Sequence, residues 1–293
     1  MTPVPVITGV VNSKCGLREP GEPFFDWYAA SFPGVGPDEF LGSFLNKNDL
    51  AKVVPYQGKT HGYEGGARVL LGDLVLLSVL WGGNRGAPLN AWASGGRSPA
   101  FAGWARSDFP NHYVTRVDAA IDLNAPGAWD DLLDLFFDLR NAFPRVQSSV
   151  LGDLYGGKKG VTHYLGSVKS ESRMRLYQKG LQVPEAGQPY HVRAEFMVKP
   201  KGAQRLVLAK SPPSQVWTYS PVARMAFDRL KGFDPGVAVR DTPRRTDLQR
   251  RFDAMCKQYG KTIAEVVSLL GSPEALGLAL LSGELPSLPN QEG

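Results

Sequence analysis

The sequence has little cysteine and no long apolar run. Its 293 residues include two cysteines, Cys15 and Cys256, which lie far apart and form no CxxC pair. This usage indicates a reducing compartment and excludes a zinc finger. The longest apolar run, from Val69 to Trp81, contains Asp73 and is too short to span a bilayer.

A signal peptide and simple repeats are not expected either. The first eleven residues contain two prolines and no basic residue, unlike a secretory signal peptide. No heptad pattern and no fixed repeat occurs, which excludes a coiled coil and a solenoid. The apolar content of 43% and charged content of 21% indicate a globular chain rather than a disordered one. We therefore expect a soluble, cytoplasmic protein without a membrane partner.

Common nucleotide-binding and hydrolase motifs are missing. Gly58-Lys59-Thr60 resembles the end of a Walker A loop, but Val53 stands where the loop needs its first glycine. No GxSxG, HExxH or GxGxxG motif occurs in a useful context. A function that needs an ATP-driven motor would therefore depend on a separate protein.

Positive charge is concentrated in one segment. The chain has 33 Lys and Arg against 28 Asp and Glu, a net charge of +5. The segment from Lys199 to Lys261 contains 14 Lys and Arg against 5 Asp, so it carries +9 and the remainder −4. A basic segment of this kind suits a polyanionic partner, although solvated helix faces explain the charge equally well.

Strand patterns dominate up to residue 198 and helix patterns dominate after it. Alternation predicts strands over residues 25–32, 65–80 (a hairpin), 89–93, 113–123, 162–167, 173–179 and 191–198. Helices are predicted over 37–50, 98–108, 128–143, 202–209, 221–230, 246–259, 262–270 and 273–281. This segregation indicates an α+β fold, with an antiparallel sheet that has a charged face and an apolar core face packed on helices. We expect a sheet domain over 1–198, a basic helical portion over 199–285 and a disordered tail over 286–293.

Three of the predicted strands place charged side chains on one face, because residues two apart point to the same side. The apolar residues between them must share the core, so the charged residues converge on the other surface. A solvent-exposed sheet face with compensating salt bridges is the alternative. If the strands are neighbours, the converging residues are Asp118, Asp122, Arg175, Tyr177, Lys179, Arg193 and Glu195. Arg116 and His191 lie on the charged faces of the same strands.

This collection of residue types suits phosphoryl chemistry. Carboxylates without a thiolate partner, here Asp118, Asp122 and Glu195, predict a hard divalent cation such as Mg²⁺ or Mn²⁺. A tyrosine is a possible covalent nucleophile toward phosphorus. Arginine and lysine side chains hold phosphates and stabilise the charge that develops on them.

Four stretches occur in the order and approximate spacing of a known family, over about residues 113–199. They are Thr115-Arg116-Val117-Asp118-Ala119-Ala120-Ile121-Asp122, Thr162-His163-Tyr164-Leu165-Gly166-Ser167 followed by Ser170, Arg175-Leu176-Tyr177-Gln178-Lys179-Gly180, and Arg193-Ala194-Glu195 with Lys199. Phe25-Asp26-Trp27, Trp81-Gly82-Gly83 and Lys257-Gln258-Tyr259-Gly260 match more loosely. With these stretches the sequence resembles the Rep_trans type of rolling-circle replication initiators, and it is most similar to the initiation factors of filamentous phages.

The resemblance implies a site-specific DNA nickase and strand transferase that forms a 5′-phosphotyrosyl link at an origin. Tyr177 would be the nucleophile, with Tyr164 as second choice, and the three acids would be metal ligands. Arg175, Lys179 and Arg193 would bind or orient phosphate. The implied partners are duplex and single-stranded origin DNA, a host helicase and the replication machinery of a bacterial cytoplasm. Many nicking enzymes bind metal through an HxH pair, whereas the four histidines here are isolated.

The basic segment supplies the predicted contacts to duplex DNA. Arg244, Arg245, Arg250 and Arg251 on a predicted helix, with Arg116 on the sheet, would contact mostly phosphates. Large aromatic residues such as Trp92 are more often core residues than base-stacking platforms. Two alternatives stay open: a non-catalytic DNA-binding regulator on the same scaffold, and a structural or partner-binding protein with an exposed charged sheet. Tyr177 together with all three acids favours the nickase over the regulator.

Overall fold

The structure is a computed structural model, and it describes residues 21–56, 62–152, 160–232 and 247–283. The chain divides into two compact units, Met1–Arg240 and Asp241–Gly293. The predicted tail over 286–293 lies outside the described residues. Among the described helices none alone has the length and apolar composition to cross a membrane; Ala254–Leu270 and Pro273–Ser282 reach it only as a pair bent by 105°.

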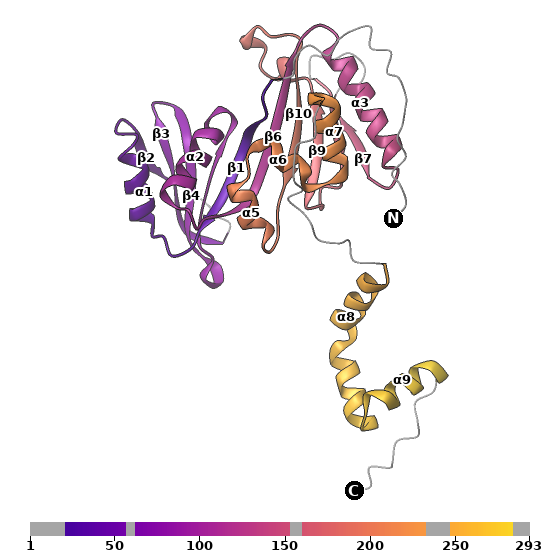
Figure 1. The fold of residues 1–293 in the computed structure, drawn as a ribbon. Coiled ribbons are helices and arrows are strands. Elements are labelled where there is room, and N and C mark those ends of the chain that lie inside the picture. Colours follow the sequence, from indigo (N-terminus) through magenta and orange to yellow (C-terminus); the bar gives the residue numbers. More distant parts are fainter. Residues whose placement is uncertain (1–20, 57–61, 153–159, 233–246, 284–293) are drawn as a thin grey trace. The chain divides into compact units, whose positions relative to one another are not determined.

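A ten-stranded sheet organises the first unit, and its strands run in the order β2-β3-β4-β5-β1-β6-β10-β9-β8-β7 (Figure 1). Every neighbouring pair is antiparallel, so the predicted α+β class with an antiparallel sheet is confirmed. The strands are β1 (Phe24–Phe32), β2 (Lys52–Pro55), β3 (Tyr63–Leu71), β4 (Leu74–Gly83), β5 (Leu89–Ser94), β6 (Tyr113–Asn124), β7 (Ser148–Leu151), β8 (Thr162–Leu165), β9 (Ser172–Tyr177) and β10 (His191–Val198).

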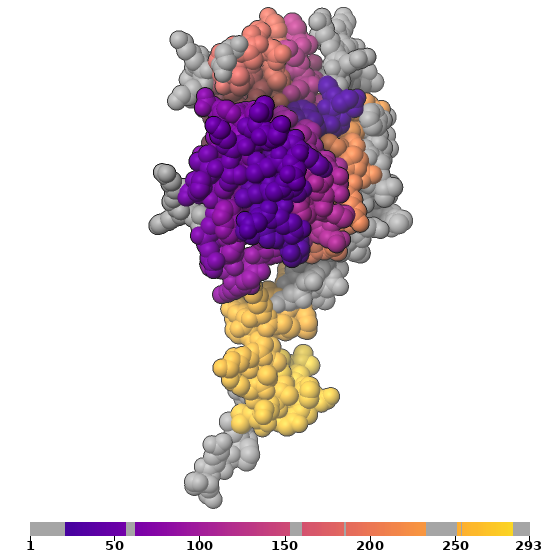
Figure 2. Space-filling view, turned by 90° about the vertical axis from the view of Figure 1, so that its left-hand side faces the viewer, coloured from indigo at the N-terminus to yellow at the C-terminus, as the bar shows by residue number. Residues whose placement is uncertain are grey.

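Seven α-helices belong to the described part of this unit, and two more form the second unit. Figure 2 views the first unit from the end formed by α1, β2 and β3, whose indigo and violet atoms face the reader. The helices are α1 (Pro37–Leu45), α2 (Ser98–Asp108), α3 (Ala128–Ala142), α4 (Lys179–Gln182), α5 (Gln204–Lys210), α6 (Pro213–Val216) and α7 (Pro221–Lys231), followed by α8 (Asp247–Leu270) and α9 (Pro273–Ser282).

The apolar face of the sheet is the core face, as the alternation predicts. Val117, Ala119 and Ile121 on β6 are fully buried. Longer helices pack on this face through large rings. The Phe101 ring of α2 meets Tyr28 of β1 at a centroid distance of 6.0 Å, and α1, α3 and α5 contact the same face. The charged face of the sheet is therefore not needed to form this core.

The boundary between the two units differs from the expected one at residues 198/199. Helices α5 to α7 belong to the sheet unit, because their apolar side chains complete its core. Trp217, in the turn before α7, lies 5.8 Å from the Phe196 ring of β10 and 6.0 Å from Phe227 of α7. The helical composition after residue 198 therefore marks a change of secondary structure within one unit.

Several local predictions were also wrong. The short strands β2 and β7 were not predicted, and the two helices predicted over 246–259 and 262–270 are the single helix α8. The strand predicted over 173–179 ends at Tyr177, because Lys179 begins the short helix α4.

Removing the Trp217 ring should destabilise the sheet unit. Trp217 is fully buried between the sheet and α7, so Trp217→Ala should cost about 3–5 kcal/mol of unfolding free energy. Urea unfolding followed by circular dichroism measures the loss. The matched control is Val168→Ala in an exposed loop, which should change stability by less than about 0.5 kcal/mol. Equal stability of the two variants would contradict this packing.

Candidate active site

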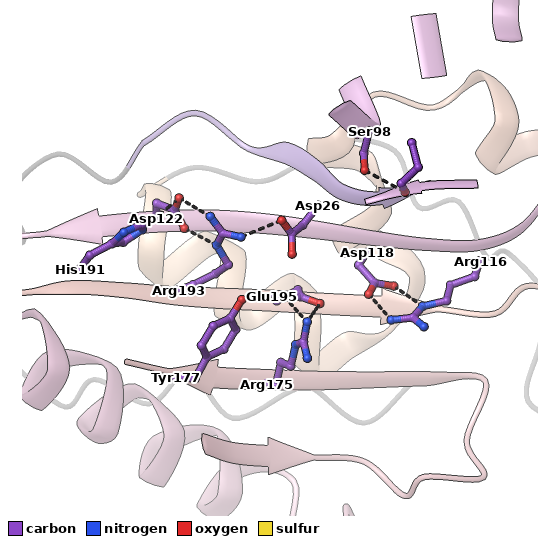
Figure 3. Close-up of polar contacts among 11 residues, drawn as sticks. Asp26, Ser98, Arg116, Asp118, Asp122, Arg175, Tyr177, His191, Arg193 and Glu195 are labelled. Carbon is purple, nitrogen blue, oxygen red and sulfur yellow. Dashed lines mark hydrogen bonds and ion pairs between the residues drawn. The ribbon is translucent and has the colours of Figure 1, made fainter. Parts of the chain in front are cut away.

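The register of three adjacent strands brings the predicted residues together. Arg193 of β10 lies opposite Asp122 of β6 on one side and opposite Tyr177 of β9 on the other. Two residues along, Glu195 lies opposite Arg175 of β9. Residues opposite each other in an antiparallel pair point to the same face. The predicted convergence of these side chains on the charged face is therefore confirmed (Figure 3).

Arg193 is the central cation of this face, and it bridges two carboxylates. Its Nε and Nη2 donate to the two oxygens of Asp122 at 2.6 and 2.7 Å, in a two-pronged arrangement. Its Nη1 donates to Asp26 of β1 at 2.7 Å. The Arg193 side chain is 9% exposed, and a buried guanidinium needs such partners to offset the loss of water. His191 lies beside the same cluster, with Nε2 3.1 Å from an Asp122 oxygen.

Asp26 is a member of the site that was not predicted. The pairing of β1 with β6 shifts register between Phe25 and Trp27, so Asp26 occupies a β-bulge. A bulge adds a residue to one strand and redirects a side chain. Simple alternation does not predict this shift. The sequence signal was the loose match at Phe25-Asp26-Trp27.

Tyr177 and Glu195 form the second cluster. The Tyr177 hydroxyl donates to Glu195 Oε2 at 3.2 Å, and Arg175 Nη2 lies 2.6 and 2.7 Å from the two Glu195 oxygens. Tyr177 is 3% exposed and Glu195 1% exposed. Burial raises the pKa of Glu195 to about 8, because it opposes the charged form more strongly than Arg175 favours it. Burial and the Glu195 charge also raise the pKa of Tyr177 above its usual range.

The third predicted acid, Asp118, is paired separately. Arg116 on the same strand donates from Nε and Nη2 to its two oxygens, and the Nε contact measures 2.8 Å. Asp118 is buried, whereas about a third of the Arg116 side chain is exposed. The guanidinium also lies over the ring of Trp27, 4.5 Å from its centroid.

These pairs do not fit the shared divalent ion that the sequence predicts. Each of the acids Asp118, Asp122 and Glu195 is bound to a different arginine. Among the residues that the structure describes, no group of three or more His, Cys, Asp or Glu side chains is arranged to hold a metal ion. The requirement for Mg²⁺ or Mn²⁺ therefore stays a prediction from the sequence.

The two remaining groups near Tyr177 are Lys179 and the second-choice tyrosine, Tyr164. Although Lys179 lies on α4 rather than on the strand, its Nζ is 5.9 Å from the centre of the Tyr177 ring. Tyr164 of β8 lies opposite Arg175 and so points to the charged face. Its partly exposed ring is covered by the Arg173 guanidinium, 3.7 Å from the centroid.

The arginines predicted to contact duplex DNA lie in different parts of the chain. Arg116 belongs to the sheet face, and Arg250 and Arg251 lie on α8 in the second unit. Arg251 is exposed. Arg244 and Arg245 lie outside the described residues.

Comparisons with known proteins find similarity in structure but none in sequence. No protein-family model matches the chain, and no curated protein sequence matches it. A rolling-circle replication initiator protein from Geobacillus stearothermophilus is similar in structure, with a TM-score of 0.48 and 18% sequence identity. The similarity covers 67% of this chain and 83% of that chain.

Truncating Arg193 should destabilise the protein, because two partly buried carboxylates lose their common partner. Arg193→Ala should lower the unfolding free energy by roughly 2–4 kcal/mol. Lys47→Ala is the control, since it removes a surface ion pair with Asp108 in which the lysine is 52% exposed. That change should cost about 1 kcal/mol or less. Chemical unfolding of both variants measures the difference, and an Arg193→Ala loss as small as the control's would contradict a structural role for the bridge.

Proposed function

We propose that this chain is a rolling-circle replication initiator that nicks DNA at an origin and transfers the cut strand through Tyr177. The observation that carries the proposal is the placement of the Tyr177 hydroxyl, 3.2 Å from Glu195 and on the face where Arg175, Arg193 and Lys179 converge. A nucleophile, a base and several cations on one rigid sheet face suit phosphoryl transfer. The family resemblance of the four sequence stretches supports the same reaction.

The proposed chemistry begins with a proton transfer. Glu195 accepts the phenolic proton of Tyr177 through their hydrogen bond, and the phenolate oxygen attacks the phosphorus of a backbone phosphodiester. A bond forms between the tyrosine oxygen and the 5′-phosphate, and the bond from phosphorus to the 3′-oxygen breaks. The 3′-oxygen takes up a proton from water and becomes a free 3′-hydroxyl, which serves as a primer.

Arginine side chains supply the electrostatic part of this mechanism. Arg175 lies 5.1 Å from the centre of the Tyr177 ring, and Arg193 lies opposite Tyr177 in the strand register. Fixed cations near the phosphate oxygens stabilise the negative charge that develops during attack. They also favour the phenolate over the phenol, against the effect of burial on the pKa of Tyr177.

Access to the hydroxyl requires side-chain movement, because Tyr177 is almost fully buried. The guanidinium of Arg175 and the ammonium of Lys179 lie near the ring, and both residues are partly exposed. DNA phosphates attract these two cations, and their displacement uncovers the tyrosine. Coupling of this kind would keep the nucleophile protected until DNA is bound.

The second unit and the partners complete the proposal. Arg250 and Arg251 of α8, with Arg244 and Arg245 before it, bind phosphates of the origin duplex in the bacterial cytoplasm. A host helicase unwinds the duplex at the nick. The chain needs this partner because its sequence has no ATP-binding loop. The second candidate function is a non-catalytic DNA-binding regulator, which the buried hydroxyl and the fully paired acids favour.

Replacing the Tyr177 hydroxyl should abolish the covalent intermediate. Wild-type protein with Mn²⁺ and supercoiled DNA carrying the origin of its own replicon should give nicked circles covalently bound to protein. Tyr177→Phe should give no adduct while keeping its fold, whereas Tyr164→Phe, on the same face, should still form it. Denaturing gels measure the adduct, and parallel reactions in EDTA measure the dependence on divalent ions. An adduct with Tyr177→Phe would show that the nucleophile is another residue, and no adduct with the wild type would favour the regulator.

Nicking should depend on pH through Glu195. This carboxyl must be ionised to accept the tyrosine proton, and its pKa is raised to about 8. The rate should therefore fall as the pH drops below 8. Glu195→Gln should lower the rate by about a hundredfold or more, as loss of a general base does. Single-turnover rates between pH 6 and 9 test this, and an unchanged profile in Glu195→Gln would contradict the role of Glu195.

A further inference from the structure

The charged face of the sheet continues well beyond Tyr177, toward β2. In the first unit, helices α1, α2, α3, α5 and α7 pack on the core face, α7 through Trp217 and Phe196. Register pairs define one row across six strands of this face. From β2 to β6 the row consists of Val54, Arg68, Ser78, Trp92, Ala29 and Arg116.

Two tryptophans meet a cation at the middle of this face. Trp27 of β1 lies opposite Ser94 of β5, and Trp92 is two residues from Ser94, so both indoles belong to the same face as diagonal neighbours. Both are partly exposed. The Arg116 guanidinium lies 4.5 Å from the Trp27 ring centroid, so a ligand arriving here meets a cation and an aromatic ring together.

Small residues surround these rings. Ala29 separates Trp92 from Arg116 in the row, and Ser78 separates Trp92 from Arg68. Ala29 and Ser78 are only 7% and 6% exposed, so larger side chains cover them. The indoles remain partly exposed above these short side chains, which is what stacking on a flat ligand requires.

The far end of the face repeats the pairing of a cation with an aromatic ring. Arg68 of β3 is exposed, and its guanidinium lies 4.9 Å from the centre of the Tyr56 ring. Strands β2 to β5 contain two basic residues, Lys52 and Arg68, and one acidic residue, Glu64. Beyond Tyr177 in the opposite direction, Arg173 covers Tyr164 in the same way.

We propose that this stacking face, made of Trp27, Trp92, Arg116, Arg68 and Tyr56, binds single-stranded DNA. Cations hold the phosphates, and the aromatic rings stack on unpaired bases, which is how proteins bind single strands without reading sequence. Trp27 lies three strands from Tyr177, and its partner Asp118 is four residues along β6 from Asp122, which is level with Tyr177. At ordinary strand spacing and rise this separation is roughly 20 Å. The choice of DNA as ligand rests on the proposed function, since the strand would extend from the phosphate that Tyr177 attacks. A paired duplex has no free base faces and is not the expected ligand.

The test separates stacking from charge and binding from catalysis. In the full chain carrying Tyr177→Phe, the affinity for a fluorescent oligothymidylate and for an abasic oligomer of equal length is measured by anisotropy. Trp27→Leu and Trp92→Leu should each weaken oligothymidylate binding roughly tenfold, as loss of one stacked base does. Binding of the abasic oligomer should stay unchanged, and Trp27→Phe should retain most of the affinity. Arg68→Ala should weaken both ligands equally and reduce the salt dependence. Phe137→Ala, an exposed ring on α3, is the matched control and should alter neither.

Each outcome decides for or against the stacking face. The stacking face would be overturned if the tryptophan variants lost affinity equally for oligothymidylate and for the abasic oligomer. It would also be overturned if Phe137→Ala lost the same affinity, or if the tryptophan variants lost affinity equally for duplex DNA. Unchanged affinity for oligothymidylate would overturn it too. Circular dichroism confirms that each variant is folded, and Trp27→Phe remains informative if Trp27→Leu is not. The binding assay does not require nicking, so it stays valid if Tyr177 is not the nucleophile. The adduct assay likewise stays valid if the stacking face does not bind single-stranded DNA.

Discussion

The arrangement of this protein depends on buried acids that are each satisfied by an arginine on one sheet face. Glu195 and Asp118 are 1% exposed, and a carboxylate so far from water needs a cation or a proton. The register of β6, β10 and β9 provides these partners, because it places Arg193 between Asp122 and Tyr177 and places Arg175 opposite Glu195. A slip of one residue would turn these charges into the apolar core, so the same pairs fix the register and the site.

The same charges that stabilise the face are the ones the proposed reaction uses. Arginines that hold carboxylates in the free protein are also the groups that bind phosphates. Glu195 is the member whose charge depends most on pH, because burial raises its pKa to about 8. A buried tyrosine donating to such a carboxyl is protected without DNA and needs only a local rearrangement to react.

Much of the fold follows from alternation in the sequence, whereas the pairing of charges does not. Alternation over residues 113–123 and 191–198 predicts which side chains share a face, because one face must be apolar. It does not determine whether Glu195 meets a metal ion or Arg175, since either partner satisfies a carboxylate. Asp26 was missed because a bulge breaks the period of two. The strands β2 and β7 were missed because neither alternates: they read Lys52-Val53-Val54-Pro55 and Ser148-Ser149-Val150-Leu151. The expected boundary at 198/199 overlooked the apolar side of α5 to α7.

The most direct test of the central claim is to locate the covalent link between protein and DNA. The adduct is digested with nuclease and trypsin, and the peptide that carries the remaining nucleotide is identified by mass spectrometry. Trypsin cleaves after Arg175 and Lys179, so the two candidate nucleophiles, Tyr177 and Tyr164, fall in different peptides. The account predicts a nucleotide on the peptide Leu176–Lys179, attached to Tyr177. A nucleotide on the peptide that contains Tyr164, or on any other tyrosine, would contradict it.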